Sequence, residues 1–453
     1  MTDALHALSP LDGRYADAAA PLRDFFSEFA YLRGRVRVEL DFLAALSDLG
    51  LFRPLSASES ARLASVHADF SDADAESILA CERQTRHDVK AIEYFLRDKL
   101  RAASLADAIP WLHFGLTSED VNNLAQALAL KGSRDQVILP ALDSLLAALC
   151  DFALRHRAVP MLARTHGQPA VPTTLGKEFA VYAARLQKVR AEIASFRFEA
   201  KLTGAVGNFN ALQAATPRVD WIAFSRSFVA GFGLEPNLVA TQILPYDNWI
   251  RYFDLLRLTN SILIDFAQDV WRYISDGGLK QAVVAGEVGS STMPQKVNPI
   301  DFENAEGNLG LANALFAFYA QKLPVSRLQR DLSDSTVRRT FGAALGHCLV
   351  AWTSLGRGMK RIAPDEEKLE AELNAHWEVV AEGAQTILRA AGRDDAYESL
   401  KARTRGRVLT EADYKSWCEA IDVDEATRAR LLDLSPASYI GLAVELTERV
   451  CKR

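Results

Sequence analysis

The feature that most constrains the fold is a regular apolar repeat between Leu175 and Phe196. Apolar residues there step by four, three, four, three, four and three positions, as Leu175, Phe179, Tyr182, Leu186, Val189, Ile193 and Phe196. This spacing places them along one face of an α-helix of roughly 25 residues and about 35 to 40 Å. Such a helix buries its apolar face only by packing lengthwise against other helices.

Similar apolar periodicity recurs in 137–154, 249–273, 309–320 and 341–355. Runs of β-branched residues bounded by turns hardly appear outside VVAGEVG, 283–289. The pattern therefore predicts an all-α fold around a central bundle of long helices. Helices of this length suit packing between subunits, so we expect a homo-oligomer.

The domain boundaries are expected at two interruptions of the helical pattern. AIPWLHFG breaks it near Pro110, and RIAPDEEKLEAEL begins a more charged segment near Pro364. A chain of 453 residues exceeds one compact core. We expect three helical domains, with the long-helix bundle in the second: 1–110, 111–363 and 364–453.

Composition excludes several classes of protein. The net charge of -6 gives no global attraction to nucleic acid or to an anionic membrane. The five cysteines are scattered without a CxxC pair, and the eight histidines lack HxxxH or HExxH spacing, so we expect no metal and no other cofactor. MTDALHALSPLDGRY does not resemble a signal peptide, and no apolar stretch approaches the ~18 residues of a membrane span. We expect a cytoplasmic protein with neither nucleic-acid nor membrane partners.

Candidate chemistry is confined to polar segments at predicted helix ends. Thr117, with Asp120 three residues later, predicts a capping box, and a plain N-cap is the alternative to a binding site there. His166 lies beside a glycine and three residues before a proline, where an imidazole is either presented to a cleft or merely structural. SRLQRDLSDSTVRR, 326–339, suits either an anion or a solvated, salt-bridged helix turn.

The segment GSSTMPQKVNP, 289–299, is less readily explained as structure alone. It combines a flexible Gly-Ser-Ser with Lys296 and Asn298 between prolines that restrict the chain path. Such a segment can close over a substrate.

The same segment matches GSSxMPxKxNP, the signature loop of the fumarase, aspartase and argininosuccinate lyase superfamily, at every fixed position. SPLDGRY, TRHDVKAIEYFL, TSEDVNNL, RTHGQPA and SRLQRDLSDSTVRR resemble the adenylosuccinate lyase family of the long bacterial type. The resemblance covers nearly the whole chain, including HWEVVAE in the last domain. Gln295 departs from it, because related sequences often have histidine there, and this puts an accessory imidazole in question.

The resemblance implies β-elimination of fumarate from adenylosuccinate, giving AMP, and from the succinylaminoimidazole carboxamide ribotide in purine biosynthesis. It implies Ser290 as general base and His166 as general acid, although the sequence does not distinguish Ser290 from Ser291. Lys296 would stabilise the serine alkoxide, and Glu303 would orient His166.

The resemblance also implies a set of substrate-binding residues and a homotetramer in which three subunits contribute to each site. His87 would assist near the phosphate or the leaving group. The substrate-binding set is Arg14, Tyr15, Arg86, His87, Asp88, Thr117, Ser118, Gln168, Gln242, Lys296, Asn298, Arg330, Ser335 and Arg339.

Two alternatives stay open. Argininosuccinate lyase shares the loop, but HGQPA and the SPLDGRY start fit it less well, and an arginine-rich pocket suits a phosphate better than a guanidinium. A non-catalytic protein on the same scaffold is the other alternative, which the presence of Ser290 and His166 disfavours.

Overall fold

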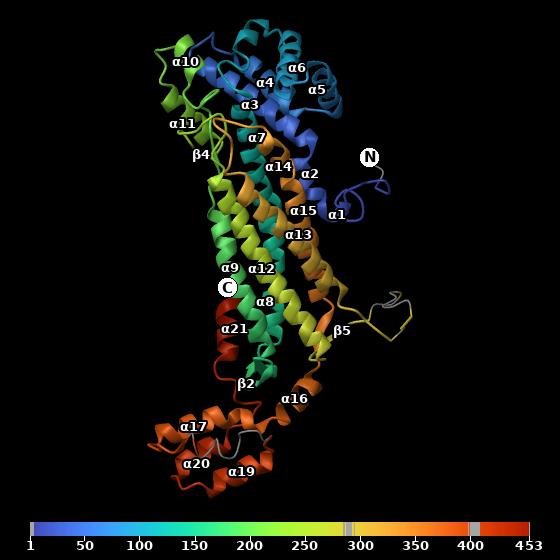
Figure 1. The fold of residues 1–453 in the computed structure, drawn as a ribbon, viewed down its shortest axis with the longest axis vertical. Coiled ribbons are helices and arrows are strands. Elements are labelled where there is room, and N and C mark those ends of the chain that lie inside the picture. The colour runs from blue at the N-terminus through green and yellow to red at the C-terminus, as the bar shows by residue number, and fades with distance from the viewer. Residues whose placement is uncertain are drawn as a thin grey trace. The chain divides into compact units, whose positions relative to one another are not determined.

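The computed structural model describes residues 4–283, 286, 292–293, 295–396, 398 and 408–452. The chain divides into two compact units. Figure 1 labels the helices and strands of both. Unit 1 consists of Met1–Ala141, Arg190–Asn260 and Asn308–Val350, and unit 2 of Leu142–Val189, Ser261–Gly307 and Ala351–Arg453. The three-domain division expected from the sequence stays a prediction.

The fold is all-α, as expected, with a few short strands. In unit 1 the elements are α1 Ala16–Ala19, η1 Ala20–Leu22, α2 Arg23–Phe26, α3 Glu28–Asp48, α4 Ala57–Ala68, α5 Asp72–Thr85, α6 Asp88–Ala102, η2 Ala106–Trp111, α7 Ser118–Ser133, the π-helical turn η3 Arg134–Ile138, β3 Glu199–Ala200, α10 Asn210–Ala215, α11 Trp221–Gly231, β4 Glu235–Pro236 and α14 Ser333–Arg338. In unit 2 they are β1 Pro160–Thr165, β2 Gln168–Thr174, β5 Leu279–Gln281, β6 Ile362–Pro364, α16 Glu366–Asn374, η4 Trp377–Val380, α17 Ala381–Ala390, α19 Glu411–Ala420, α20 Glu425–Leu432 and α21 Ala443–Cys451.

The apolar repeats of the sequence correspond to long helices. The repeat that begins at Leu175 forms a helix of 21 residues, and the repeat around Phe253 forms one of 29 residues. The boundary between the units falls within these helices: α8 Leu139–Arg155, α9 Leu175–Ser195, α12 Asp247–Ser275, α13 Ile300–Lys322 and α15 Phe341–Met359.

Aromatic rings form much of the unit 1 core. The ring of Phe253 on α12 stacks on that of Phe316 on α13 at 5.5 Å and lies 4.8 Å from that of Phe341 on α15. All three side chains are buried. A second buried apolar cluster packs α3, α4, α5 and α6 together, with Leu43, Leu63, Ile78 and Leu96 among its members. These contacts hold the segments that carry the unit 1 site residues.

Unit 2 has its own aromatic contacts. The ring of Phe179 on α9 lies 4.2 Å from that of Phe152 on α8 and 5.5 Å from that of Phe266 on α12. The shorter helices near the C-terminus form a separate core around Trp377, Tyr414 and similar residues.

The strands form two-stranded sheets: β1 with β2 and β5 with β6 are antiparallel, and β3 with β4 is parallel. The pairing of β1 with β2 is irregular between Leu162 and Arg164. The strand-like run VVAGEVG falls mostly outside the described residues, since 284–285 and 287–289 are not among them.

One helical run, Ser118–Arg155, is long and apolar enough by length and composition to cross a membrane, although we expected no such stretch from the sequence. Core helices of soluble proteins meet the same criterion. The first turn of this run carries two buried carboxylates, Glu119 and Asp120.

Candidate active site

The start of α7 is fixed by Asp120. Its Oδ2 accepts a hydrogen bond from the backbone N–H of Thr117 at 3.0 Å, as the predicted capping box requires. Its Oδ1 lies 2.8 Å from Lys201 Nζ and accepts from the N–H of Thr203 at 3.0 Å. The Asp120 and Lys201 side chains are fully buried. Thr117 and Ser118 are therefore tied to the segment that begins at Lys201.

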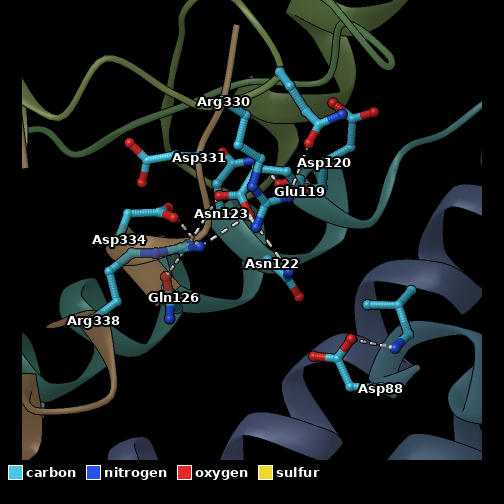
Figure 2. A network of polar contacts seen from close by, with 12 residues as sticks. Asp88, Glu119, Asp120, Asn122, Asn123, Gln126, Arg330, Asp331, Asp334 and Arg338 are labelled. Atoms are coloured by element: carbon cyan, nitrogen blue, oxygen red, sulfur yellow. Dashed lines mark hydrogen bonds and ion pairs between the residues drawn. The ribbon is translucent and has the colours of Figure 1, made fainter. Parts of the chain in front are cut away.

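Glu119, the neighbour of Asp120, is the centre of a second buried network (Figure 2). Its Oε1 and Oε2 each lie 2.9 Å from a different terminal nitrogen of Arg338, a bidentate arrangement. Arg338 also donates to Gln126 Oε1 at 2.6 Å and pairs with Asp334 at 3.0 Å. Burial alone would lower the pKa of Arg338, but Glu119 and Asp334 help to raise it well above its ordinary value.

Arg330 and Gln242, two predicted binding residues, are in direct contact. Arg330 Nη1 donates to Gln242 Oε1 at 3.1 Å, and Arg330 Nη2 lies 3.5 Å from Glu119. Gln242 Nε2 donates to the carbonyl of Ala205 at 3.0 Å. The contacts of Glu119 thus extend through Arg330 and Gln242 to the turn at Ala205.

Arg86, His87 and Asp88 lie where α5 ends and α6 begins. Arg86 has a left-handed backbone, with φ of 56°, and ends α5. His87 caps α6, because its Nδ1 accepts from the N–H of Lys90 at 3.1 Å. This bond leaves Nε2 as the nitrogen available to a ligand.

Asp88 joins this segment to the rest of unit 1. Its carboxylate pairs with Arg35 at 2.6 Å, and Arg35 Nε donates to Asn122 Oδ1 at 2.8 Å. Burial would raise the pKa of Asp88, but Arg35 and a backbone N–H lower it overall. Arg35 therefore connects α6 with α7.

A cavity of about 360 Å³ lies beside Arg339 in unit 1. The Arg339 side chain pairs with Glu28 at 2.5 Å and is partly exposed. Of the other predicted residues in this region, Arg14 is exposed and Ser335 is half-buried on α14. Tyr15 packs against a small buried cluster of Leu11, Ala19 and Val350. The cavity is lined by Ser9, Leu11, Asp12, Ala19, Leu22, Arg23, Phe26, Ser27, Arg339, Thr340, Gly342 and Ala343.

His166 and Gly167 form the turn between β1 and β2 in unit 2. Their φ angles are 53° and 74°, so both residues are left-handed, as two-residue hairpin turns of this kind require. Histidine tolerates this conformation better than bulky or β-branched residues do. The turn exposes His166, and Gln168, also exposed, begins β2.

The residues around the signature loop are only partly described. Ser290 and Ser291 lie outside the described residues. Lys296 is exposed, and its backbone N–H donates to the carbonyl of Met293 at 3.0 Å. Asn298 is half-buried.

Glu303 is exposed on α13, and its Oε1 accepts from Trp271 Nε1 at 3.1 Å. In the part of unit 2 that the structure describes, no hydrogen bond or ion pair joins Glu303 to His166 within one chain. The orienting role of Glu303 stays a prediction.

Sequence reasoning missed the buried charges that hold these segments: Arg35, Glu119 and Lys201, together with the anchoring role of Arg338. The sequence around Lys201 gave no signal of its burial, because the charged residues Arg197 and Glu199 lie within four positions of it. Within the described ranges, no group of three or more His, Cys, Asp or Glu side chains is arranged to hold a metal ion.

Comparisons with known proteins identify related sequences. The sequence profile of a family described as lyase matches residues 13–313, and one described as adenylosuccinate lyase C-terminal matches 326–440. Proteins named adenylosuccinate lyase are similar along their whole length: that of Haemophilus influenzae is 46% identical over 98% of this chain and 99% of its own, and that of Escherichia coli K12 is 45% identical over 98% and 99%.

Two solved structures share the fold. The 3-carboxy-cis,cis-muconate lactonizing enzyme from Pseudomonas putida has a TM-score of 0.74 at 22% identity and covers 96% of each chain. The fumarate lyase from Mesorhizobium has a TM-score of 0.76 at 17% identity and covers 96% of this chain and 97% of its own.

Proposed function

The chain belongs to the adenylosuccinate lyase family, and from this premise we propose that it cleaves adenylosuccinate to AMP and fumarate. The observation that carries the proposal is 46% identity to a protein of that name over 98% of the chain. The same chemistry would release fumarate from the succinylaminoimidazole carboxamide ribotide, because both substrates carry a succinyl group on nitrogen.

The reaction needs a base, an acid and groups that stabilise negative charge. In the proposed mechanism Ser290, as alkoxide, removes a proton from the carbon beside a succinyl carboxylate. The electron pair forms the double bond of fumarate, the carbon–nitrogen bond breaks, and protonated His166 gives its proton to the leaving nitrogen. Lys296 and Asn298 bind the carboxylate on which charge develops.

The nucleotide is proposed to bind to segments of unit 1. Arg330 and Arg339 supply positive charge to the phosphate, and His87 offers Nε2 because Nδ1 is occupied by Lys90. Thr117 and Ser118 receive the succinyl portion at the positive end of α7, where Asp120 fixes the backbone.

A homotetramer with shared sites is the proposed assembly. Leu311 and Phe318, seven residues apart on α13, are 56% and 48% exposed, and Leu258 on α12 is 49% exposed. Exposed apolar side chains at this helical spacing favour burial against another copy. In this assembly Glu303 orients His166 of another subunit, and we place the enzyme in the cytoplasm.

Turnover of three substrates tests the proposal. The purified protein is incubated separately with adenylosuccinate, the succinylaminoimidazole carboxamide ribotide and argininosuccinate, and fumarate release is followed by absorbance. We expect release from the first two alone. Release from argininosuccinate alone would favour the alternative lyase, and no release from any of the three would favour a non-catalytic protein.

A further inference from the structure

We propose that Glu119 is a positioning residue: its buried carboxylate, through Arg338 and Arg330, holds the residues that bind the nucleotide. The inference deepens the proposed function and depends on it. Glu119 itself is fully buried beneath these arginines, so the role is an indirect one.

The contact between Glu119 and Arg338 has the geometry of an anchor. Two parallel contacts of 2.9 Å fix the plane of the guanidinium group relative to α7. Gln126, seven residues further along α7, accepts from Arg338 at 2.6 Å. The side chain of Arg338 is 1% exposed. This arginine therefore binds within the protein and is not available to a ligand.

The anchor determines the direction of Arg339. Arg338 ends α14, and consecutive residues of a helix point about 100° apart, so a buried Arg338 turns Arg339 toward the surface. Arg339 lines the 360 Å³ cavity. Ser335 belongs to the same short helix. Release of Arg338 would let α14 rotate and displace both residues.

Glu119 also limits the position of Arg330. The two charged groups lie 3.5 Å apart, and Gln242 holds the other terminal nitrogen of Arg330 at 3.1 Å. Four buried or largely buried charges result, two negative on Glu119 and Asp334 and two positive on Arg330 and Arg338. Figure 2 shows these side chains converging on the first turns of α7.

A change in net charge and a loss of positioning would alter nucleotide binding in opposite directions. Substitution of Glu119 by Gln leaves one positive charge in excess, which by itself would strengthen binding of a phosphate. Loss of the anchor would weaken binding, because Arg330, Ser335 and Arg339 would no longer converge. The two effects have opposite signs.

The experiment compares Glu119→Gln with Glu93→Gln in the full-length protein. Glu93 is a matched control, because it is also buried and bridges two cations, Lys90 at 2.7 Å and Arg97 at 2.6 Å. AMP affinity is measured by calorimetry, KM and kcat with adenylosuccinate, and stability by urea unfolding. We expect both variants to be less stable, but Glu119→Gln alone to weaken AMP binding and raise KM, by about 10- to 100-fold, with a smaller change in kcat.

The double variant Glu119→Gln/Arg338→Met tests whether stability alone explains the effect. Removal of both partners should recover part of the lost stability, because the charges that remain, negative on Asp334 and positive on Arg330, balance again. AMP affinity should stay low. The double variant also answers the question if Glu119→Gln does not fold.

Two outcomes would overturn this inference without affecting the proposed function. One is an AMP affinity of Glu119→Gln within about twofold of wild type. The other is a double variant that regains AMP affinity together with stability. A wild-type protein that neither binds AMP nor cleaves adenylosuccinate would instead overturn the proposed function.

Discussion

Lys201 and Asp120 form an ion pair of 2.8 Å in which both side chains are fully buried. Removing one partner of such a pair leaves the other charge buried without compensation. We predict that Lys201→Met lowers the free energy of unfolding by ~3–5 kcal/mol in urea titrations at fixed protein concentration.

The matched control is Arg185→Met, which breaks an ion pair of 2.6 Å with Asp265 whose side chains are 42% and 52% exposed. Solvated pairs contribute ~0–1 kcal/mol. Equal losses in the two variants would show that burial does not determine the cost.

A glycine turn next to Gln242 gives a second prediction. Gly207 has φ of 86°, and a methyl group added there would lie 1.8 Å from the carbonyl oxygen of Ala240. Gly392 has φ of 84° with nothing within 4 Å of an added methyl. We expect Gly392→Ala to cost about 1–2 kcal/mol of unfolding free energy and Gly207→Ala more than ~3 kcal/mol. Equal losses of unfolding free energy in the two variants would show that the left-handed backbone angle, and not the clash with Ala240, determines the cost.

His113 should make stability depend on pH. Its Nδ1 lies 2.6 Å from Oε1 of the buried Glu39. Burial would lower the pKa of His113, but Glu39, with smaller effects of Glu93 and Asp120, raises it overall. A raised pKa in the folded state stabilises below the ordinary value of about 6.5, and this stabilisation is lost as pH rises through the raised value.

The measurement is urea unfolding of wild type and His113→Asn at pH 6 and at pH 8.5. Asparagine suits the left-handed backbone of this position, where φ is 53°. We expect the variant to lose more stability at pH 6. His347 is the opposite case, because burial lowers its pKa, so His347→Asn should lose more at pH 8.5. The same pH dependence in both variants would contradict this account.

The variant His166→Asn distinguishes the proposed role of His166 as general acid from its structural role in the turn between β1 and β2. Asparagine retains the left-handed turn, so the midpoint of thermal unfolding should hardly change, while kcat falls by about 10²–10⁴. A loss of activity that follows a loss of stability would make His166 structural.

Coexpression of His166→Asn with Ser290→Ala tests the sharing of sites. If each site takes His166 and Ser290 from different subunits, random hybrids should regain about a quarter of wild-type activity. If both residues come from one chain, no hybrid site is complete and activity should stay absent.

The sequence predicted local features well and tertiary burial poorly. The repeat from Leu175 predicted α9, because helical periodicity is a property of neighbouring residues. Thr117 and Asp120 predicted the start of α7 for the same reason.

The role of Glu119 could not be predicted in this way. An acidic residue in the first turn of a helix usually interacts with the helix dipole in solvent. Its burial depends on Arg338, 219 residues later in the chain. The sequence also could not show that Arg338 is buried and Arg339 exposed, because nothing in the neighbouring residues distinguishes the two arginines.

The most direct measurement of the central claim is the product balance from adenylosuccinate, with Ser290→Ala as the matched control. We predict that wild type releases AMP and fumarate in equal amounts, and that Ser290→Ala releases neither while binding AMP as wild type does. Wild type that yields no fumarate would contradict the proposed function, and substantial turnover by Ser290→Ala would assign the base to Ser291 or to another residue.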